Sequence, residues 1–589
     1  MTGWSERMLE PDGRAALTEQ LRPPAGYELI HAVGTTFTLD LTTALSIPLS
    51  FAGHQLREDG NQIAILDAVR RATEKVDIFA QAGQIRVPPA SDLVAFLEPM
   101  VHPVVPRRAG ALFHPKVWVL EFGRGSSRSY RFLCSSRNLT GDHSWDVMVR
   151  LDGEPTATKQ VRSAPIRDFL MVLPPMAVVP LPSVRAGRIR ELALRVGEVE
   201  WELPPDVREV EFHPFGVGRP DTIDLKGKRH LIVSPFLSNE GIDLAAPFSK
   251  ESITVVSRKE SFDALSPATL TRITGFVLND AAIGADESPD EALVGLHAKI
   301  FALDRMSGSR VFAGSANATD AAFSGNFEFM VELVGPQPRM GVAAIFGPES
   351  DLLQMMEPYN ATGGVLPSNT ELADFALESA LRSVASAQLR NTVVPEGTEL
   401  YSIYIETISA ARLKPEFSAV VTLLSRPGNA VPLPSPAAGE WVRTLPLTDV
   451  TPFLVVRVTD ARGESLSTVV RAELVGDIPN RRDAIIAARL DTPEKFLQLL
   501  LLMLSLTGAD ASRLPVDSAG GFGEWAMAGG GVFESLVKAL EGNPGALDDL
   551  APLISRLRDD PRNVLPPDFP ELWDSIWAAR LRIKAVVHE

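Results

Sequence analysis

The sequence is poor in the features that mark secreted and metal-binding proteins. It has a single cysteine, Cys134, so it cannot form an intramolecular disulfide. It contains no H-E-x-x-H or paired C-x-x-C pattern, whose spacings indicate zinc sites, and no G-x-S-x-G serine elbow. We therefore expect no metal, no cofactor, and a reducing, cytoplasmic setting.

Long hydrophobic runs are also missing. The strongest one, residues 496–506, is interrupted by Gln498 and Ser505, whereas a membrane-spanning helix needs about 18 apolar residues or more. The first residues lack a basic segment followed by an apolar stretch, so we expect no export signal. We interpret the run as a buried helix and expect no membrane association.

The charge balance argues against broad nucleic-acid affinity, because the net charge is −17. The distribution is uneven, however. Residues 101–145 carry seven Lys and Arg against two acids, and three of these arginines, Arg107, Arg108 and Arg137, are candidate substrate-binding residues. A polyanionic substrate is one interpretation of this basic segment, and a solvated surface is the other.

Two histidine–lysine pairs lie in matching surroundings, His114-Pro115-Lys116 and His297-Ala298-Lys299. Each pair is embedded in an apolar, β-prone run, so we expect each on a strand. Side chains at i and i+2 of a strand project to the same side, where a histidine and a lysine can address one anion. The duplication therefore predicts a site that handles phosphate.

The residues that follow each pair are also repeated in order. They are an acid, a segment ending in Ser-x-Asn, and a second acid. These residues are Asp304, Ser315, Asn317 and Glu328 in the second copy and Glu121, Ser136, Asn138 and Asp146 in the first. An ordered duplication of this kind is much less expected from surface polarity than a lone His-x-Lys would be.

This duplicated H-x-K-x4-D and G-S-x-N pattern resembles the phospholipase D superfamily, whose members hydrolyse or exchange phosphodiesters. The second copy fits the pattern closely. The first copy has Glu121 in place of the aspartate and Ser135 in place of the glycine. In both copies the gap between the first acid and the serine is longer than the family norm.

Phosphodiester chemistry gives each of these residue types a role. One neutral imidazole attacks phosphorus to form a phosphohistidine, and the other, protonated, donates to the leaving oxygen and then activates water. The lysines hold the phosphate, the serines and asparagines donate hydrogen bonds from loops, and Glu328 and Asp146 orient the imidazoles. The expected catalytic residues are His114, Lys116, Ser136, Asn138, His297, Lys299, Ser315 and Asn317.

Two points stay open at this stage. Asp304 and Glu121 are expected to support the scaffold rather than touch substrate. The nucleophile is undecided, because the resemblance favours His114 and the better-formed second motif favours His297.

The fold class that we expect is α/β, with two phospholipase D-like α/β repeats forming a pseudo-twofold catalytic unit. A β-rich accessory module and a helical C-terminal region follow it. Helical spacing is expected over residues 62–75 and 267–278. The expected divisions are 1–25, a polar lead-in; 26–200, the first repeat; 201–340, the second repeat; 341–478, linker and β-rich module; and 479–589, helical.

A glycine-rich stretch at 519–531 lacks a following Gly-Lys-Ser/Thr, so we interpret it as a loop rather than a nucleotide site. His143 is the other histidine near the first motif, lying between Asn138 and Asp146.

The function expected is that of a metal-independent phosphodiesterase, foremost a nuclease. Family members of this size and layout resemble bacterial nucleases of phage-defence or mobile-element loci, which implies a helicase or other defence subunit as a partner. A monomer with both half-sites and a homodimer are both compatible with the sequence. The alternatives are an inactive binding or scaffold subunit and a phospholipid phosphodiesterase.

Overall fold

The computed structural model describes residues 17–586 apart from 56–70, 89–91, 142–143, 219–222, 248, 250, 252, 280–294, 410, 412, 437 and 480; between 481 and 568 it describes only isolated positions. The predicted buried helix at 496–506 and the glycine-rich stretch at 519–531 lie outside the described residues. So do His143 and most of the helix expected over 62–75.

The first motif belongs to a seven-stranded sheet. Its strands are β1 (Glu28–Thr36), β3 (Val76–Gln81), β5 (Val101–Val104), β6 (Val117–Arg124), β7 (Ser127–Ser135), β8 (Met148–Pro155) and β9 (Val199–Trp201). They lie in the order β5-β3-β1-β6-β7-β8-β9. The strands β1, β3 and β5 are parallel, and β6, β7 and β8 continue as an antiparallel meander.

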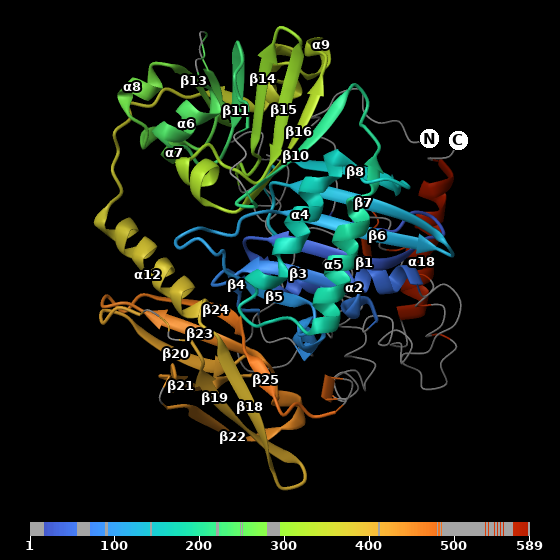
Figure 1. Cartoon of the computed structure of the whole chain (residues 1–589), viewed down its shortest axis with the longest axis vertical. Helices are drawn as coiled ribbons and strands as arrows, with labels where there is room; N and C mark the ends of the chain where they lie inside the picture. Colours follow the sequence, from blue (N-terminus) through green and yellow to red (C-terminus); the bar gives the residue numbers. More distant parts are fainter. Residues whose placement is uncertain are drawn as a thin grey trace.

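The helices described in this unit include α1 (Leu17–Gln20), α2 (Leu41–Gln55), α4 (Ala164–Val172) and α5 (Ser183–Val196), and β2 (Leu39–Asp40) pairs with β4 (Ile85–Arg86). Figure 1 shows α4 and α5 side by side in front of the sheet. Their buried apolar residues share one core with β6, β7 and the second sheet.

The second motif belongs to an eight-stranded sheet. Its strands are β10 (Glu209–Phe215), β11 (Arg229–Val233), β12 (Ile253–Val256), β13 (Ile273–Leu278), β14 (Ile300–Arg305), β15 (Gly308–Gly314), β16 (Glu328–Gly335) and β17 (Met356–Pro358). The order β13-β12-β11-β14-β15-β16 repeats β5-β3-β1-β6-β7-β8, with the same parallel and antiparallel pairings. The two sheets thus share one topology across six strands.

Among the described residues, six short α-helices accompany the second sheet. They are α6 (Asn239–Ala245), α7 (Lys259–Asp263), α8 (Pro267–Leu270), α9 (Gln337–Met340), α10 (Val342–Phe346) and α11 (Asp351–Gln354). Figure 1 places this unit, drawn in green, above the first sheet, and its strand β15 contacts β7 and β8.

In both units, an equivalent hydrogen bond holds the loop that carries the motif asparagine. The hydroxyl of Thr36, at the end of β1, accepts from the backbone N–H of Leu139 at 2.9 Å. The hydroxyl of Ser234, just after β11, accepts from the N–H of Ala318 at 2.9 Å. Leu139 and Ala318 each follow the motif asparagine, so the same bond closes the same loop twice.

Two sequence expectations differ from the structure here. The helix expected over 267–278 ends at Leu270, and residues 273–278 form strand β13. Parallel pairing with β12 outweighs the helical spacing of this β-branched segment, and Gly275 lies in its middle. The strand β17 pairs with β13, so the second sheet continues beyond the boundary expected at residue 340.

Residues 369–475 form a β-rich module. Its elements are α12 (Asn369–Ala385), β18 (Leu389–Glu396), β19 (Leu400–Thr407), β20 (Ser418–Leu423), β21 (Arg426–Pro432), β22 (Glu440–Pro446), β23 (Phe453–Thr459), β24 (Ser465–Arg471) and β25 (Glu473–Val475). Two four-stranded sheets, β22-β19-β18-β25 and β21-β20-β23-β24, share a core with α12. The predicted hairpin is present as β23 and β24, and Gly463 in its turn has φ 87°. Its second strand, expected to reach Leu474, ends at Arg471, and Glu473–Val475 forms β25 in the other sheet.

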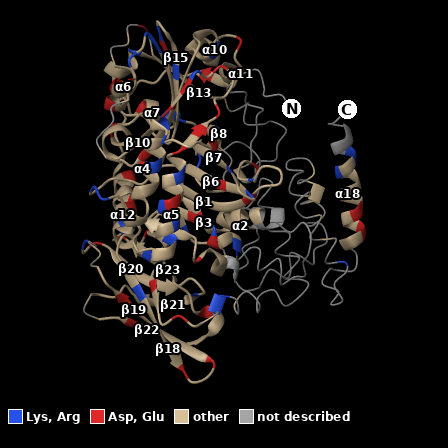
Figure 2. Cartoon of the chain, turned by 45° about the vertical axis from the view of Figure 1, so that its right-hand side comes forward, with Lys and Arg blue, Asp and Glu red and all other residues tan. Residues whose placement is uncertain are grey.

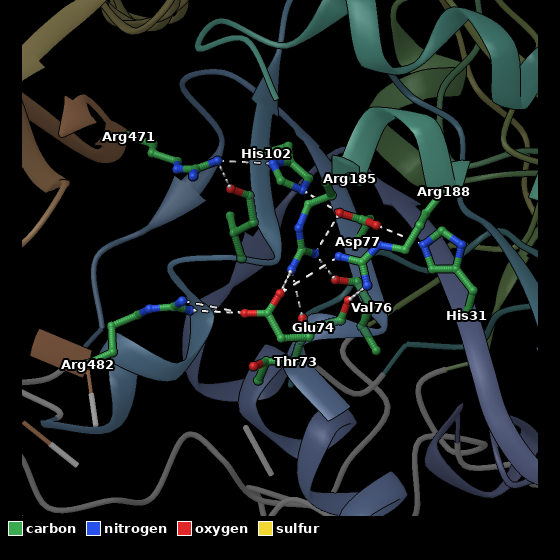
Figure 3. Close-up of polar contacts among 11 residues, drawn as sticks. His31, Thr73, Glu74, Val76, Asp77, His102, Arg185, Arg188, Arg471 and Arg482 are labelled. Atoms are coloured by element: carbon green, nitrogen blue, oxygen red, sulfur yellow. Dashed lines mark hydrogen bonds and ion pairs between the residues drawn. The ribbon is translucent and has the colours of Figure 1, made fainter. Parts of the chain in front are cut away.

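A buried polar network, shown in Figure 3, joins this module to the first sheet. The carboxylate of Asp77 on β3 accepts hydrogen bonds from His31 at 2.9 Å, His102 at 2.7 Å and Arg185 at 2.9 Å. Arg471 of β24 donates to the second ring nitrogen of His102 at 3.1 Å. Burial alone would raise the pKa of Asp77, but the hydrogen bonds from His102 and His31 hold it well below its usual range.

In the last described helix, α18 (Phe569–Val586), the buried residues Phe569, Trp573 and Ile576 belong to the same hydrophobic cluster as residues of the first sheet. Within the described part of the chain, no helix combines the length and the apolar character that a membrane span requires.

Candidate active site

The two motifs lie together because the backbone of each His-x-Lys segment forms a hydrogen bond with the other unit. The N–H of His114 donates to the carbonyl of Phe327 at 2.8 Å, and the N–H of His297 donates to that of Trp145 at 2.9 Å. Phe327 and Trp145 each directly precede the second acid of the other copy. The two histidine–lysine pairs therefore lie just before β6 and β14 and not on strands as expected. Their backbone forms hydrogen bonds with the opposite unit instead of a neighbouring strand.

His114 is held in one tautomer by Glu328. Its Nδ1 lies 2.8 Å from Oε2 of this fully buried carboxylate, which also accepts from the Ser315 hydroxyl. A carboxylate only accepts, so Nδ1 carries the proton and Nε2 keeps its lone pair. The Phe37 ring contacts the imidazole edge-to-face, with 5.0 Å between the ring centroids.

His297 has the opposite arrangement. Its Nδ1 lies 3.4 Å from Nζ of Lys299. When Lys299 is protonated its ammonium group can only donate, so in that state Nδ1 is the acceptor and Nε2 carries the proton. Asp146, which the sequence assigned to orient this ring, instead forms an ion pair with Arg137 at 3.7 Å. The second acids of the two copies are thus used differently.

The two lysines are buried beside the imidazoles. Each Nζ donates to the backbone carbonyl of its own histidine at 2.7 Å. Burial lowers the pKa of Lys116 well below its ordinary value, and Lys299 adds to this effect. Burial lowers the pKa of Lys299 to about 7, and Arg258 contributes.

Burial also lowers the pKa of both histidines, to about 4 for His114 and to about 2 for His297. Lys299, Lys116 and His114 each lower the pKa of His297 further, which places the four side chains within electrostatic reach of one another. An anion such as a phosphodiester would favour the charged form of every one of these groups.

The motif serines and asparagines hold the loops around these groups. The Ser136 hydroxyl accepts from the N–H of Val147 at 2.9 Å, as the Ser315 hydroxyl does from the N–H of Phe329 at 2.9 Å. The side-chain oxygen of Asn138 accepts from Thr38 N–H at 3.4 Å, and that of Asn317 accepts from the Ser234 hydroxyl at 3.5 Å. These bonds fix the loops that border the site.

The first acids lie away from the histidines, within the strands. Glu121 on β6 accepts from Tyr130 at 3.2 Å and from Arg195 at 2.7 Å. Asp304 on β14 accepts from the hydroxyl of Ser309 at 2.7 Å and from the backbone of Val342 at 3.1 Å. Both acids brace the scaffold.

The basic segment at 101–145 contributes unevenly. Arg107 is exposed, and Arg108 donates to the carbonyl of Ser324 in the second unit. Arg131 is buried and pairs with Asp152 at 2.6 Å, so it serves the fold. Figure 2 shows acidic and basic residues interspersed over the described elements.

Sequence reasoning missed three site residues, Phe37, Phe236 and Arg258. Arg258 donates through Nε and Nη2 to the carbonyl of Leu296, the residue before His297, at 3.2 and 2.9 Å. Its guanidinium lies over the Phe236 ring, 5.2 Å from the centroid. Phe37 follows β1, and Phe236 follows β11, the equivalent strand of the second sheet. Their position after these two strands was the signal available in the sequence.

A group with metal-ligand chemistry lies elsewhere. Within the described ranges, Glu211, His213 and Glu332 bring their ligand atoms within 4.8 Å of one another. Glu332 is already paired with Arg310 and accepts from His213 at 2.8 Å. Its carboxylate charge is therefore compensated by protein side chains.

No protein-family model and no curated protein matches the chain. Among solved structures, yeast tyrosyl-DNA phosphodiesterase is similar over 60% of this chain and 96% of its own, with 13% identity and a TM-score of 0.36. Polyphosphate kinase from Porphyromonas gingivalis is similar over 63% of this chain and 50% of its own, with 14% identity and a TM-score of 0.30. Scores this low carry no argument about function. In its own duplicated motifs and paired half-sites, the chain resembles the phospholipase D superfamily.

Proposed function

We propose that this chain is a metal-independent phosphodiesterase that acts through a phosphohistidine on His114, and that its substrate is nucleic acid. The observation that carries the proposal is the pair of opposite tautomers: His114 offers the Nε2 lone pair and His297 the Nε2 proton. Two buried lysines beside them neutralise the non-bridging oxygens of the phosphate.

The first step forms the His114 Nε2–phosphorus bond as the bond from phosphorus to the leaving oxygen breaks. The His297 Nε2 proton goes to that oxygen, and the Lys299 ammonium passes its own proton to Nδ1, 3.4 Å away. The general acid is therefore the Lys299–His297 pair, and its loss of a proton is a property of the two coupled groups together. No imidazolate anion is formed.

The second step reverses this path. The Nε2 of His297 takes a proton from water, the Nδ1 proton returns to Lys299, and the hydroxide attacks phosphorus to release His114. Glu328 stabilises the positive charge on His114 while the phosphohistidine exists. Each group ends in its starting protonation state.

Nucleic acid is supported as the substrate by the arginines on the loops beside the first motif. Arg107 is exposed, and Arg108 and Arg137 flank the junction between the two units. A role in phage or mobile-element defence, with a helicase or other defence subunit as partner, extends the proposal by resemblance alone.

The test is cleavage of labelled single- and double-stranded DNA and RNA in excess EDTA by the wild type, His114→Ala and His297→Ala. His213→Ala is a matched control, because His213 also bonds a buried glutamate but lies outside the site. We expect chelator-resistant cleavage by the wild type and the control only. Activity that survives in His114→Ala, or that needs a metal, would refute the mechanism, and activity of neither kind would favour a scaffold role.

A further inference from the structure

Phe236 is an aromatic side chain held at the edge of the site with its ring in solvent. The side chain is 48% exposed, although its backbone is fixed. The Ser234 hydroxyl donates to the carbonyl of Phe236 at 2.7 Å and accepts from Ala318 in the second motif loop. The ring position is therefore tied to the loop that borders His297.

Arg258 covers one face of that ring and leaves the rest to solvent. Its guanidinium lies 5.2 Å from the ring centroid, and its Nε and Nη2 donate to the carbonyl of Leu296, next to His297. A guanidinium fixed by two hydrogen bonds keeps the ring in place. The arginine also lowers the pKa of His297, which shows that the pair lies close to the proposed general acid.

The first unit has no equivalent of this ring. There the Thr36 hydroxyl donates to the carbonyl of Thr38 at 2.7 Å, just as Ser234 does to that of Phe236. Thr38 thus occupies the position of Phe236. The aromatic on that side, Phe37, is turned against the imidazole of His114. The exposed ring is therefore a feature of the His297 side, where the leaving group departs.

We propose that Phe236, backed by Arg258, stacks the nucleobase of the leaving nucleotide of a single-stranded nucleic acid. Every base offers a π face, and an aromatic ring beside a cationic groove is the usual way to hold a single strand without reading its sequence. In a duplex those faces are already stacked. The inference rests on the proposed function and adds the strand state and the side on which the base lies.

The experiment uses three dinucleoside monophosphates, each with one cleavable phosphodiester. The first substrate carries both bases. The second has a tetrahydrofuran abasic sugar on the leaving side, and the third has this sugar on the other side. Analysis of the products identifies which side leaves. We would measure kcat/KM in EDTA for the wild type, Phe236→Leu and Phe375→Leu. Phe375, on α12, is 58% exposed and serves as the control for loss of a surface aromatic ring.

For the wild type and Phe375→Leu, loss of the leaving-side base should lower kcat/KM about tenfold, as loss of one base–aromatic stack does. Loss of the other base should have a smaller effect. Phe236→Leu should no longer distinguish the leaving-side abasic substrate from the complete one.

The inference would be overturned if the wild type cleaved the complete and the leaving-side abasic substrates equally well, or if Phe236→Leu still distinguished between them. Either result would leave the proposed function intact. Hydrolysis of bis(4-nitrophenyl) phosphate with no cleavage of any dinucleotide would overturn both the nuclease assignment and the inference. In that case, turnover of phosphatidylcholine vesicles would identify a lipid substrate.

Discussion

His114 and His297 occupy the same place in two copies of one motif, yet their neighbours favour protonation of different ring nitrogens. Glu328 accepts from Nδ1 of the first, and Lys299 donates to Nδ1 of the second. The sequence left the nucleophile undecided because both copies carry a histidine, a lysine and a later acid. The partner of His297 lies within its own motif, whereas the partner of His114 comes from the other unit through a contact that no local spacing encodes.

The charge on Lys299 should control the alkaline side of the pH profile. The pKa of this lysine is lowered to about 7 by burial. The profile of kcat/KM reports the free enzyme, so it should fall as the pH rises through about 7, because Lys299 then lacks the proton that it passes to Nδ1 of His297 as Nε2 protonates the leaving oxygen. A 4-nitrophenyl leaving group needs no proton, so its profile should fall less. Identical profiles for the two kinds of substrate would contradict proton delivery by this pair.

Glu328→Gln should lower kcat by about a hundredfold or more, because an amide neither fixes the Nδ1–H tautomer uniquely nor stabilises the charged imidazole. Glu332→Gln is the matched control, since Glu332 lies on the same strand β16 and binds His213 instead. Its rate should stay near that of the wild type. Melting temperatures of both variants would be measured alongside kcat. Equal losses of kcat in the two variants would indicate a general effect of replacing an acid on β16.

At the scale of elements, the strands were the most predictable part. Val76–Ala80, residues 230–234 and Phe453–Thr459 are short apolar runs rich in β-branched residues, and each is a strand within a residue or two. The segment 267–278 failed because its apolar spacing suits a helix while its neighbour β12 offers a parallel strand partner. Tertiary pairing of this kind is invisible in a local window.

The Asp77 network is the element-scale contact whose loss should matter most. Asp77→Asn removes a buried charge that three donors share, and leaves Arg185 and its neighbours partly uncompensated. We expect a loss of about 3–5 kcal/mol in the free energy of unfolding, measured by urea denaturation. Asp374→Asn breaks the largely exposed pair with Arg462 and should leave the free energy of unfolding nearly unchanged, because solvent screens this pair. Similar losses in both would show that the buried network adds no special stability.

At the scale of the whole molecule, one chain carries both halves of the site. The duplicated motifs predicted this assembly, but not the exchange in which each motif segment bonds the acid-bearing segment of the other unit. That exchange depends on how two sheets of like topology face each other. Glu121 and Ser135, where the first copy departs from the motif, lie on β6 and at the end of β7 rather than against the imidazoles.

Because both halves come from one chain, mixtures of His114→Ala and His297→Ala chains should stay inactive. Each variant lacks one imidazole, and the bonds between units are intramolecular. The measurement is EDTA-resistant phosphodiester hydrolysis after co-incubation and after joint refolding. Recovery of activity on mixing would indicate that units exchange between chains in a dimer.

The central claim is a covalent phosphate on His114, and trapping it is the most direct test. A labelled phosphodiester would be quenched in alkali, where phosphohistidine survives, and the modified peptide located by mass spectrometry in the wild type and in each histidine variant. We predict label on His114 in the wild type, more label in His297→Ala when the leaving group is 4-nitrophenol, and none in His114→Ala. Label on His297, or turnover with no labelled histidine at all, would contradict the account.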